Sequence, residues 1–134
     1  MTLFQIVALY VALNLILAII LTLRVGLVRV KGRISLGDGG DQTLLSRIRA
    51  HGNFTESAPL ALIGLMALAM MGASPLLLHI FGAGFLLGRV LHALGMAGKN
   101  AVGPTRAPGM MLTLAALLGT ALTLLYLVFT FEIM

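Results

Sequence analysis

Residues 1–23 contain no charged side chain, and a run of 23 residues is long enough to cross a bilayer as a helix. The rest of the chain shares this character, because 60% of its 134 residues are hydrophobic and only 10% are charged. A soluble domain contains about 25% charged residues. The run also lacks the basic start and the small-residue cleavage site of a signal peptide, so we expect it to remain as a spanning helix. The sequence therefore predicts an all-α integral membrane protein.

Three further apolar segments follow, and together with the first they predict a four-helix membrane bundle that forms one domain over residues 1–134. The expected helices lie at about residues 3–24, 44–71, 75–96 and 108–131. Pro75 should start the third helix after a tight turn, because proline suits the first turn of a helix. Asn14, in the middle of the first helix, is expected to form a hydrogen bond to another helix.

The basic residues predict the orientation of the bundle. All nine lysines and arginines fall on the side that carries the first and third connections; they are Arg24, Arg29, Lys31, Arg33, Arg47, Arg49, Arg89, Lys99 and Arg106. By the positive-inside rule this side is cytoplasmic, and both termini lie outside. The short connections favour a bacterial inner membrane.

Other classes of protein are disfavoured by the same composition. The net charge of +5 is explained by membrane topology rather than by nucleic-acid binding, because the basic residues are few and flank apolar segments. The chain has no cysteine, which excludes disulfides and a cysteine nucleophile. Its three histidines have no metal-ligand spacing, so we expect no metal site.

Polar side chains gather at the start of the second helix, in the segment RIRAHGNFTESAP at residues 47–59. Arg49, Asn53 and Glu56 stand at positions i, i+4 and i+7, which places them on one face of a helix. These three residues form our candidate binding face.

The lengths of the apolar runs predict how deep the charges lie. The uncharged runs at 57–71 and 76–88 hold 15 and 13 residues. Each covers only about 20 Å of a hydrocarbon layer about 30 Å thick. Glu56, Arg89 and His92 should therefore lie within membrane depth, where ionisable residues pair with each other or serve a function. We expect Glu56 and Arg89 to interact within one subunit, with a direct ligand role as the alternative.

Three motifs together resemble the MAPEG family, the membrane-associated proteins in eicosanoid and glutathione metabolism. They are Arg49-Ala50-His51-Gly52-Asn53-Phe54-Thr55-Glu56 with Pro59, Gly88-Arg89-Val90-Leu91-His92, and Arg106-Ala107-Pro108. The resemblance covers all four helices and implies a homotrimer that binds glutathione between subunits on the cytoplasmic half of the bilayer. It implies glutathione contacts at Arg29, Arg49, Asn53, Glu56, Arg89 and His92. It also implies that Arg106 stabilises the glutathione thiolate.

The function implied is a glutathione-dependent membrane transferase or peroxidase that acts on lipophilic electrophiles or hydroperoxides. The residue types suit this ligand, because arginine forks bind carboxylates and Glu56 can accept the glutathione ammonium. Many catalytic members carry tyrosine, serine and tyrosine where this chain has Met96, Ala107 and Met110. A non-catalytic glutathione- or lipid-binding scaffold is therefore the alternative. A small proton-coupled exporter that uses Glu56 is a further one.

Overall fold

The protein is a bundle of four helices. The computed structural model describes residues 1–97 and 103–130, so Lys99 and the predicted helix end at residue 131 lie outside the described residues. The helices are α1 (Leu3–Gly32), α2 (Gln42–Met70), α3 (Pro75–Gly95) and α4 (Arg106–Thr130). Each is long and apolar enough to cross a membrane. The predicted all-α membrane architecture is confirmed.

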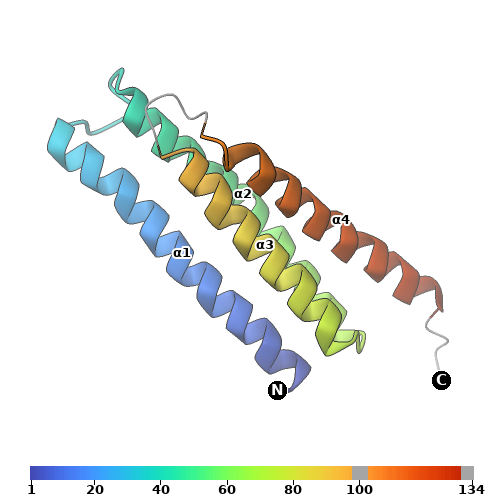
Figure 1. Ribbon diagram of the computed structural model, residues 1–134. Coiled ribbons are helices and arrows are strands. Elements are labelled where there is room, and N and C mark those ends of the chain that lie inside the picture. The colour runs from blue at the N-terminus through green and yellow to red at the C-terminus, as the bar shows by residue number, and fades with distance from the viewer. Residues whose placement is uncertain (98–102, 131–134) are drawn as a thin grey trace.

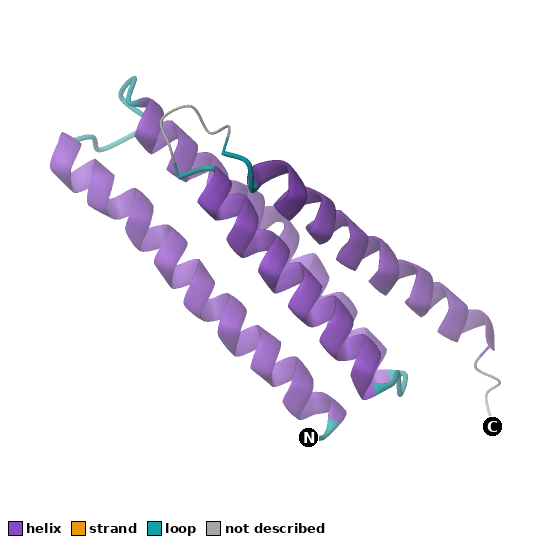
Figure 2. Cartoon of the chain, viewed as in Figure 1, coloured by secondary structure: helices purple, strands orange, loops and turns teal. Residues whose placement is uncertain are grey.

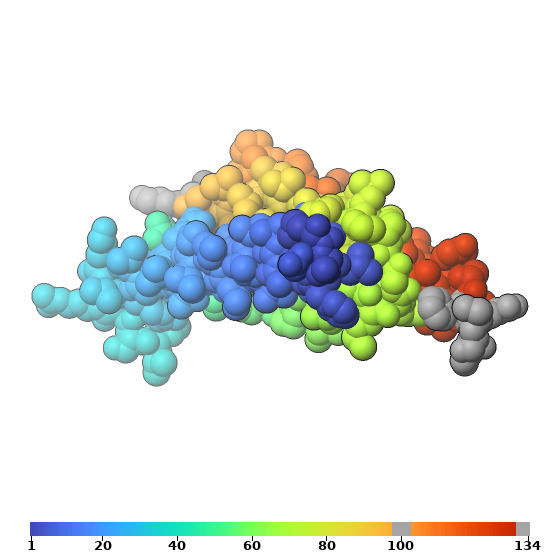
Figure 3. All heavy atoms as spheres, turned by 90° about the horizontal axis from the view of Figure 1, so that it is seen from below, coloured from blue at the N-terminus to red at the C-terminus, as the bar shows by residue number. Residues whose placement is uncertain are grey.

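The helices run side by side along one long axis, joined by short connections (Figures 1 and 2). Within the described residues, α1 packs against α2 and α3, whereas α4 packs against α3 and α2. The side chains of α1 form one face of the molecule between those of α2 and α3 (Figure 3). The C-terminal ends of α1 and α3 and the N-terminal ends of α2 and α4 lie at the same end of the bundle (Figure 1).

Short polar side chains start the first three helices. Thr2, Asp41 and Ser74 each accept hydrogen bonds from backbone N–H groups of the first turn that have no partner within the helix. Pro75 begins α3 as predicted, since its missing N–H costs nothing in the first turn. Gly72 precedes it with a φ of +72°, a conformation that glycine adopts without strain.

Helix α1 extends to Gly32, well beyond the predicted end at residue 24. Charge alone does not end a helix, because lysine and arginine are good helix formers and are favoured near a helix C-terminus. Residues 3–23 span about 31 Å at 1.5 Å per residue, which matches the hydrocarbon layer. Arg24 therefore lies at its boundary, and the last two turns of α1 project beyond it.

Helices α3 and α4 approach each other closely at two glycines. A Cβ atom on Gly88 would lie 2.6 Å from Thr113 Oγ1, and one on Gly109 would lie 2.7 Å from the Gly88 carbonyl oxygen. Gly84, one turn away, leaves an ordinary 3.6 Å distance to Ala116 Cβ. The two backbones are therefore in contact at Gly88 and Gly109, as small residues allow in membrane helices.

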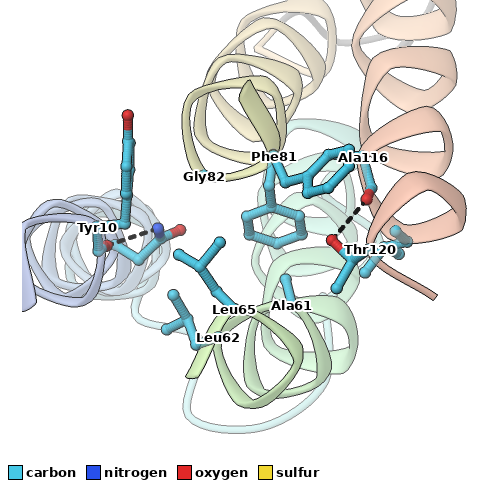
Figure 4. A pocket seen from close by; sticks show the side chains of 11 residues that line it. Tyr10, Ala61, Leu62, Leu65, Phe81, Gly82, Ala116 and Thr120 are labelled. Carbon is cyan, nitrogen blue, oxygen red and sulfur yellow. Dashed lines mark hydrogen bonds between the residues drawn. The ribbon is translucent and has the colours of Figure 1, made fainter. Parts of the chain in front are cut away.

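Asn14 lies in a small cavity between the four helices (Figure 4). Its Nδ2 donates to the Tyr10 carbonyl oxygen of the same helix at 2.8 Å, so the predicted bond to another helix is wrong. Among the other residues that line the cavity, Leu62, Leu65 and Phe81 offer no hydrogen-bonding group, and the Thr120 hydroxyl donates to the Ala116 carbonyl oxygen of its own helix. The cavity volume of about 10 Å³ suffices for a single water molecule.

Candidate functional site

Arg89 lies at the centre of the site, on α3, with only 3% of its surface exposed. Its Nε donates to Thr113 Oγ1 on α4 at 2.9 Å, and its Nη1 donates to the Asn53 carbonyl oxygen on α2 at 3.2 Å. Thr113 in turn donates to the Gly109 carbonyl oxygen at 2.8 Å. Groups on the two neighbouring helices α2 and α4 thus fix the guanidinium in one orientation.

The predicted ion pair between Glu56 and Arg89 is wrong. Among residues 1–97 and 103–130, no carboxylate lies within ion-pair distance of Arg89. Phe54 and Ala58 face the core of the bundle, so Glu56, two residues from each, points to the opposite side of α2 and is exposed. Equal depth in the membrane did not ensure a shared face. The exporter alternative loses its premise too, because it required a carboxylate buried in the bundle.

The candidate binding face of α2 points away from its own bundle. Arg49 and Glu56 are exposed, and Asn53 lies half-buried at the edge of this face. The face continues along the helix through Leu60 and Ile63, each 67% exposed. We call these five residues the outward face of α2.

Three basic side chains converge where α3 ends and α4 begins. His92 lies one turn from Arg89, is 3% exposed, and is subject to the positive charges of Arg89 and Arg106. Arg106 is the first residue of α4, and its backbone N–H donates to the Gly103 carbonyl oxygen at 3.1 Å. We call Arg89, His92 and Arg106 the basic cluster. The positive charge of its two arginines favours an anionic ligand.

The remaining predicted residue, Arg29, lies half-buried in the last turn of α1. Its Nη1 donates to the Ser35 carbonyl oxygen at 3.5 Å, which directs the guanidinium toward the first connection. The structure thus brings Asn53 next to the basic cluster and places Arg29, Arg49 and Glu56 outside it. The ligand contacts of all these residues stay predictions.

Two methionines and a threonine complete the site. Met110 Sδ accepts from Arg89 Nη2 at 3.5 Å, and Met96 Sδ accepts from Asn53 Nδ2 at 3.9 Å. The sequence marked both methionines as departures from a family pattern but did not predict their contacts with polar groups. Thr113 was not predicted from the sequence. The feature that could have indicated it is a hydroxyl side chain within an apolar helix, four residues after Gly109.

Comparison with known proteins agrees with this architecture. The model described as the MAPEG family matches residues 7–126. Two curated relatives, each called inner membrane protein YecN, come from Escherichia coli strains K12 and O6:H1 CFT073. Each is 36% identical over 111 residues, which cover 83% of this chain and 83% of the relative. No solved structure matches the chain.

Proposed function

Because this chain belongs to the MAPEG family and is a multi-pass inner membrane protein, we propose that it binds glutathione at the basic cluster and activates the thiol. The activated sulfur then attacks a lipophilic electrophile that reaches the site from the bilayer and displaces its leaving group. With a hydroperoxide, the sulfur breaks the O–O bond and an alcohol leaves, and a second glutathione converts the resulting sulfenic acid to the disulfide with loss of water. The protein is, on this proposal, a membrane glutathione transferase or peroxidase.

The buried Arg89 guanidinium is the observation that carries the proposal. A cation at membrane depth is costly unless it is paired or faces water. Arg89 has neutral acceptors and no carboxylate partner among the described residues, so an anionic ligand would compensate its charge. Glutathione presents two carboxylates, and a planar guanidinium binds a carboxylate through two parallel hydrogen bonds.

The basic cluster also suits activation of a thiol. A free thiol has a pKa near 8.5, so little thiolate exists at neutral pH. One close arginine that favours the anion by about 1.4 kcal/mol raises the thiolate population about tenfold. Arg106 supplies that charge in our proposal, while Arg89 and His92 hold the rest of the ligand.

We include a homotrimer in the proposal. Arg49 and Glu56 point away from the basic cluster of their own subunit, and the same face carries the exposed Leu60 and Ile63. A neighbouring subunit packed on the outward face of α2 would cover the apolar part and receive the two charged groups at a shared site. The mass of the purified protein in detergent should then equal three subunits. A monomeric protein that binds one glutathione per chain would contradict this part of the proposal.

The scaffold alternative has one observation in its favour. Met96 and Met110, which contact Asn53 and Arg89, carry thioethers, and a thioether donates no proton. A site lined in this way can hold a ligand without serving as a general acid. Turnover of chlorodinitrobenzene by the purified protein would favour the enzyme, whereas glutathione binding without turnover would favour the scaffold.

The decisive experiment is calorimetric titration of the detergent-purified protein with glutathione. We expect the wild type to bind and Arg89→Gln to bind at least about tenfold more weakly, because a charged hydrogen-bonding partner is lost. Lys31→Gln removes one exposed positive charge from the end of α1 and should leave binding unchanged. Glu56→Gln alters an exposed side chain and leaves the bundle interior undisturbed. A change in its glutathione affinity would therefore indicate a contact of Glu56 with the ligand. An absence of heat in the wild type at millimolar glutathione would overturn the proposal.

A further inference from the structure

A second pair of arginines, neither of which belongs to the basic cluster, meets at the α1–α2 contact. Arg47 Nη1 donates to the Arg24 carbonyl oxygen at 2.9 Å, and Arg24 Nη1 reaches the Ala93 carbonyl oxygen of α3 at 3.4 Å. Both arginines are half-buried, and the charge of Arg47 acts on Arg24. The packing of three helices thus holds two like charges together.

No described carboxylate compensates this pair. Asp38 and Asp41 accept hydrogen bonds from backbone N–H groups of Gly40, Thr43 and Leu44, and Glu56 lies on the outward face of α2. Arg47 Nε is buried and has no hydrogen-bond partner. A buried donor on a charged group that stays unsatisfied costs free energy, so this arrangement calls for an anionic acceptor.

The depth of the pair indicates where that acceptor comes from. Arg24 follows 21 residues of α1 that span about 31 Å, which places it at the boundary of the hydrocarbon layer. Phosphates of lipid headgroups lie just beyond that boundary. The exposed side chains of Ile16 and Ile20 precede Arg24 at intervals of four residues, so they form an apolar line that leads from it into the bilayer.

We propose that Arg24 and Arg47 bind the phosphate of an anionic phospholipid, with one acyl chain lying along Ile16 and Ile20. Two guanidinium groups bind phosphate oxygens through several charged hydrogen bonds, and basic pockets between membrane helices bind anionic headgroups. This proposal does not rest on glutathione binding at the basic cluster. By the predicted orientation it lies in the cytoplasmic leaflet.

The test uses native mass spectrometry of the full-length protein in detergent, with phosphatidylglycerol or phosphatidylcholine added. We expect the wild type to retain phosphatidylglycerol preferentially. The double variant Arg24→Gln/Arg47→Gln should bind phosphatidylglycerol at least about tenfold more weakly, because each arginine near a membrane surface contributes to anionic lipid binding. The control Lys31→Gln/Arg33→Gln removes the same net charge from exposed positions and should bind within about twofold of the wild type.

Equal losses of phosphatidylglycerol affinity in the two double variants would overturn the proposal, because they would reflect net charge alone. Inorganic phosphate that displaces the lipid completely at low millimolar concentration would overturn the assignment to a lipid and indicate a soluble anion. If the double glutamine variant does not fold, Arg47→Lys serves instead, since it keeps the charge and removes Nε. That variant should lose preference for phosphatidylglycerol, and full retention would count against the site.

Discussion

At Arg89 a cation inside the bundle is stabilised by a hydroxyl, a carbonyl and a thioether rather than by a carboxylate. Neutral acceptors satisfy the N–H groups of a guanidinium but do not cancel its charge. The positive field therefore remains available to a ligand, whereas an internal ion pair would have neutralised it. This distinction separates a binding site from a purely structural pair.

Replacing Thr113 by valine tests how strongly Arg89 is held. Thr113→Val removes the acceptor of Arg89 Nε without changing side-chain volume much, and it should lower the free energy of unfolding by about 1–3 kcal/mol. Thr123→Val is the matched control, because Thr123 Oγ1 donates within α4 to the Gly119 carbonyl oxygen. Thermal unfolding in detergent measures both variants. Equal losses of stability in the two variants would mean that the bond to Arg89 contributes nothing more than a hydroxyl that bonds within its own helix.

Replacing Arg106 by alanine tests the proposed activation of the thiol. If Arg106 acts on the sulfur, Arg106→Ala should leave glutathione affinity within a few-fold and lower turnover by about 10²-fold or more. The pKa of the bound thiol should rise, because the charge that favours the thiolate is gone. Ultraviolet absorbance of the thiolate against pH measures this pKa. An unchanged titration would remove Arg106 from the mechanism, and lost binding with a normal thiol pKa would make it a carboxylate ligand.

At the scale of helices, the close contact of α3 and α4 positions the site. Gly88 and Gly109 bring the two backbones together directly beside Arg89 and His92. The same contact allows Thr113 on α4 to reach Arg89 on α3. A wider separation of the helices would lengthen that bond.

A methyl group at Gly109 should separate these helices. Gly109→Ala would place its Cβ 2.7 Å from the Gly88 carbonyl oxygen, and backbone cannot move aside as a flexible side chain can. We expect a loss of about 1–3 kcal/mol, the usual range for overpacking, together with weaker glutathione binding. Gly84→Ala is the control, because its Cβ would meet Ala116 Cβ at an ordinary 3.6 Å. Equal stability of the two variants would contradict the contact.

At the scale of the molecule, the described lysines and arginines lie in the half of the bundle where α1 and α3 end and α2 and α4 begin, and the chain begins at the other end (Figure 1). The basic cluster and the Arg24–Arg47 pair share that half. The charged groups that we propose bind glutathione and a lipid headgroup are thus gathered near one membrane surface. The core of the opposite half is formed mainly by apolar side chains such as Ile6, Val7 and Leu68.

The positive-inside rule predicts that both termini lie outside the cytoplasm. A C-terminal alkaline phosphatase fusion, which is active only outside, should be active in intact bacteria. The same reporter inserted at Gly39 in the first connection should be inactive, and a green fluorescent protein at that position should fluoresce. The reverse pattern of activities would overturn the orientation and move the basic cluster to the outer half of the membrane.

The sequence by itself determined the number of spanning helices, the start of α3 at Pro75 and the common face of Arg49, Asn53 and Glu56. Hydropathy, proline chemistry and the helical repeat are local properties, so a single segment carries all the information they need. The resemblance to the MAPEG family was equally local, since it depended on short motifs, and the family match confirms it.

Only the tertiary structure decided which way each helix face points. Helical spacing states that residues share a face but does not state whether that face is directed inward, so Glu56 was wrongly paired with Arg89. The rotation of each helix follows from backbone contacts such as that of Gly88 with Gly109, and these join residues far apart in the sequence. The contact of α3 with α4 gave Arg89 the hydroxyl of Thr113 as a partner, and the packing of α1 on α2 brought Arg24 and Arg47 together.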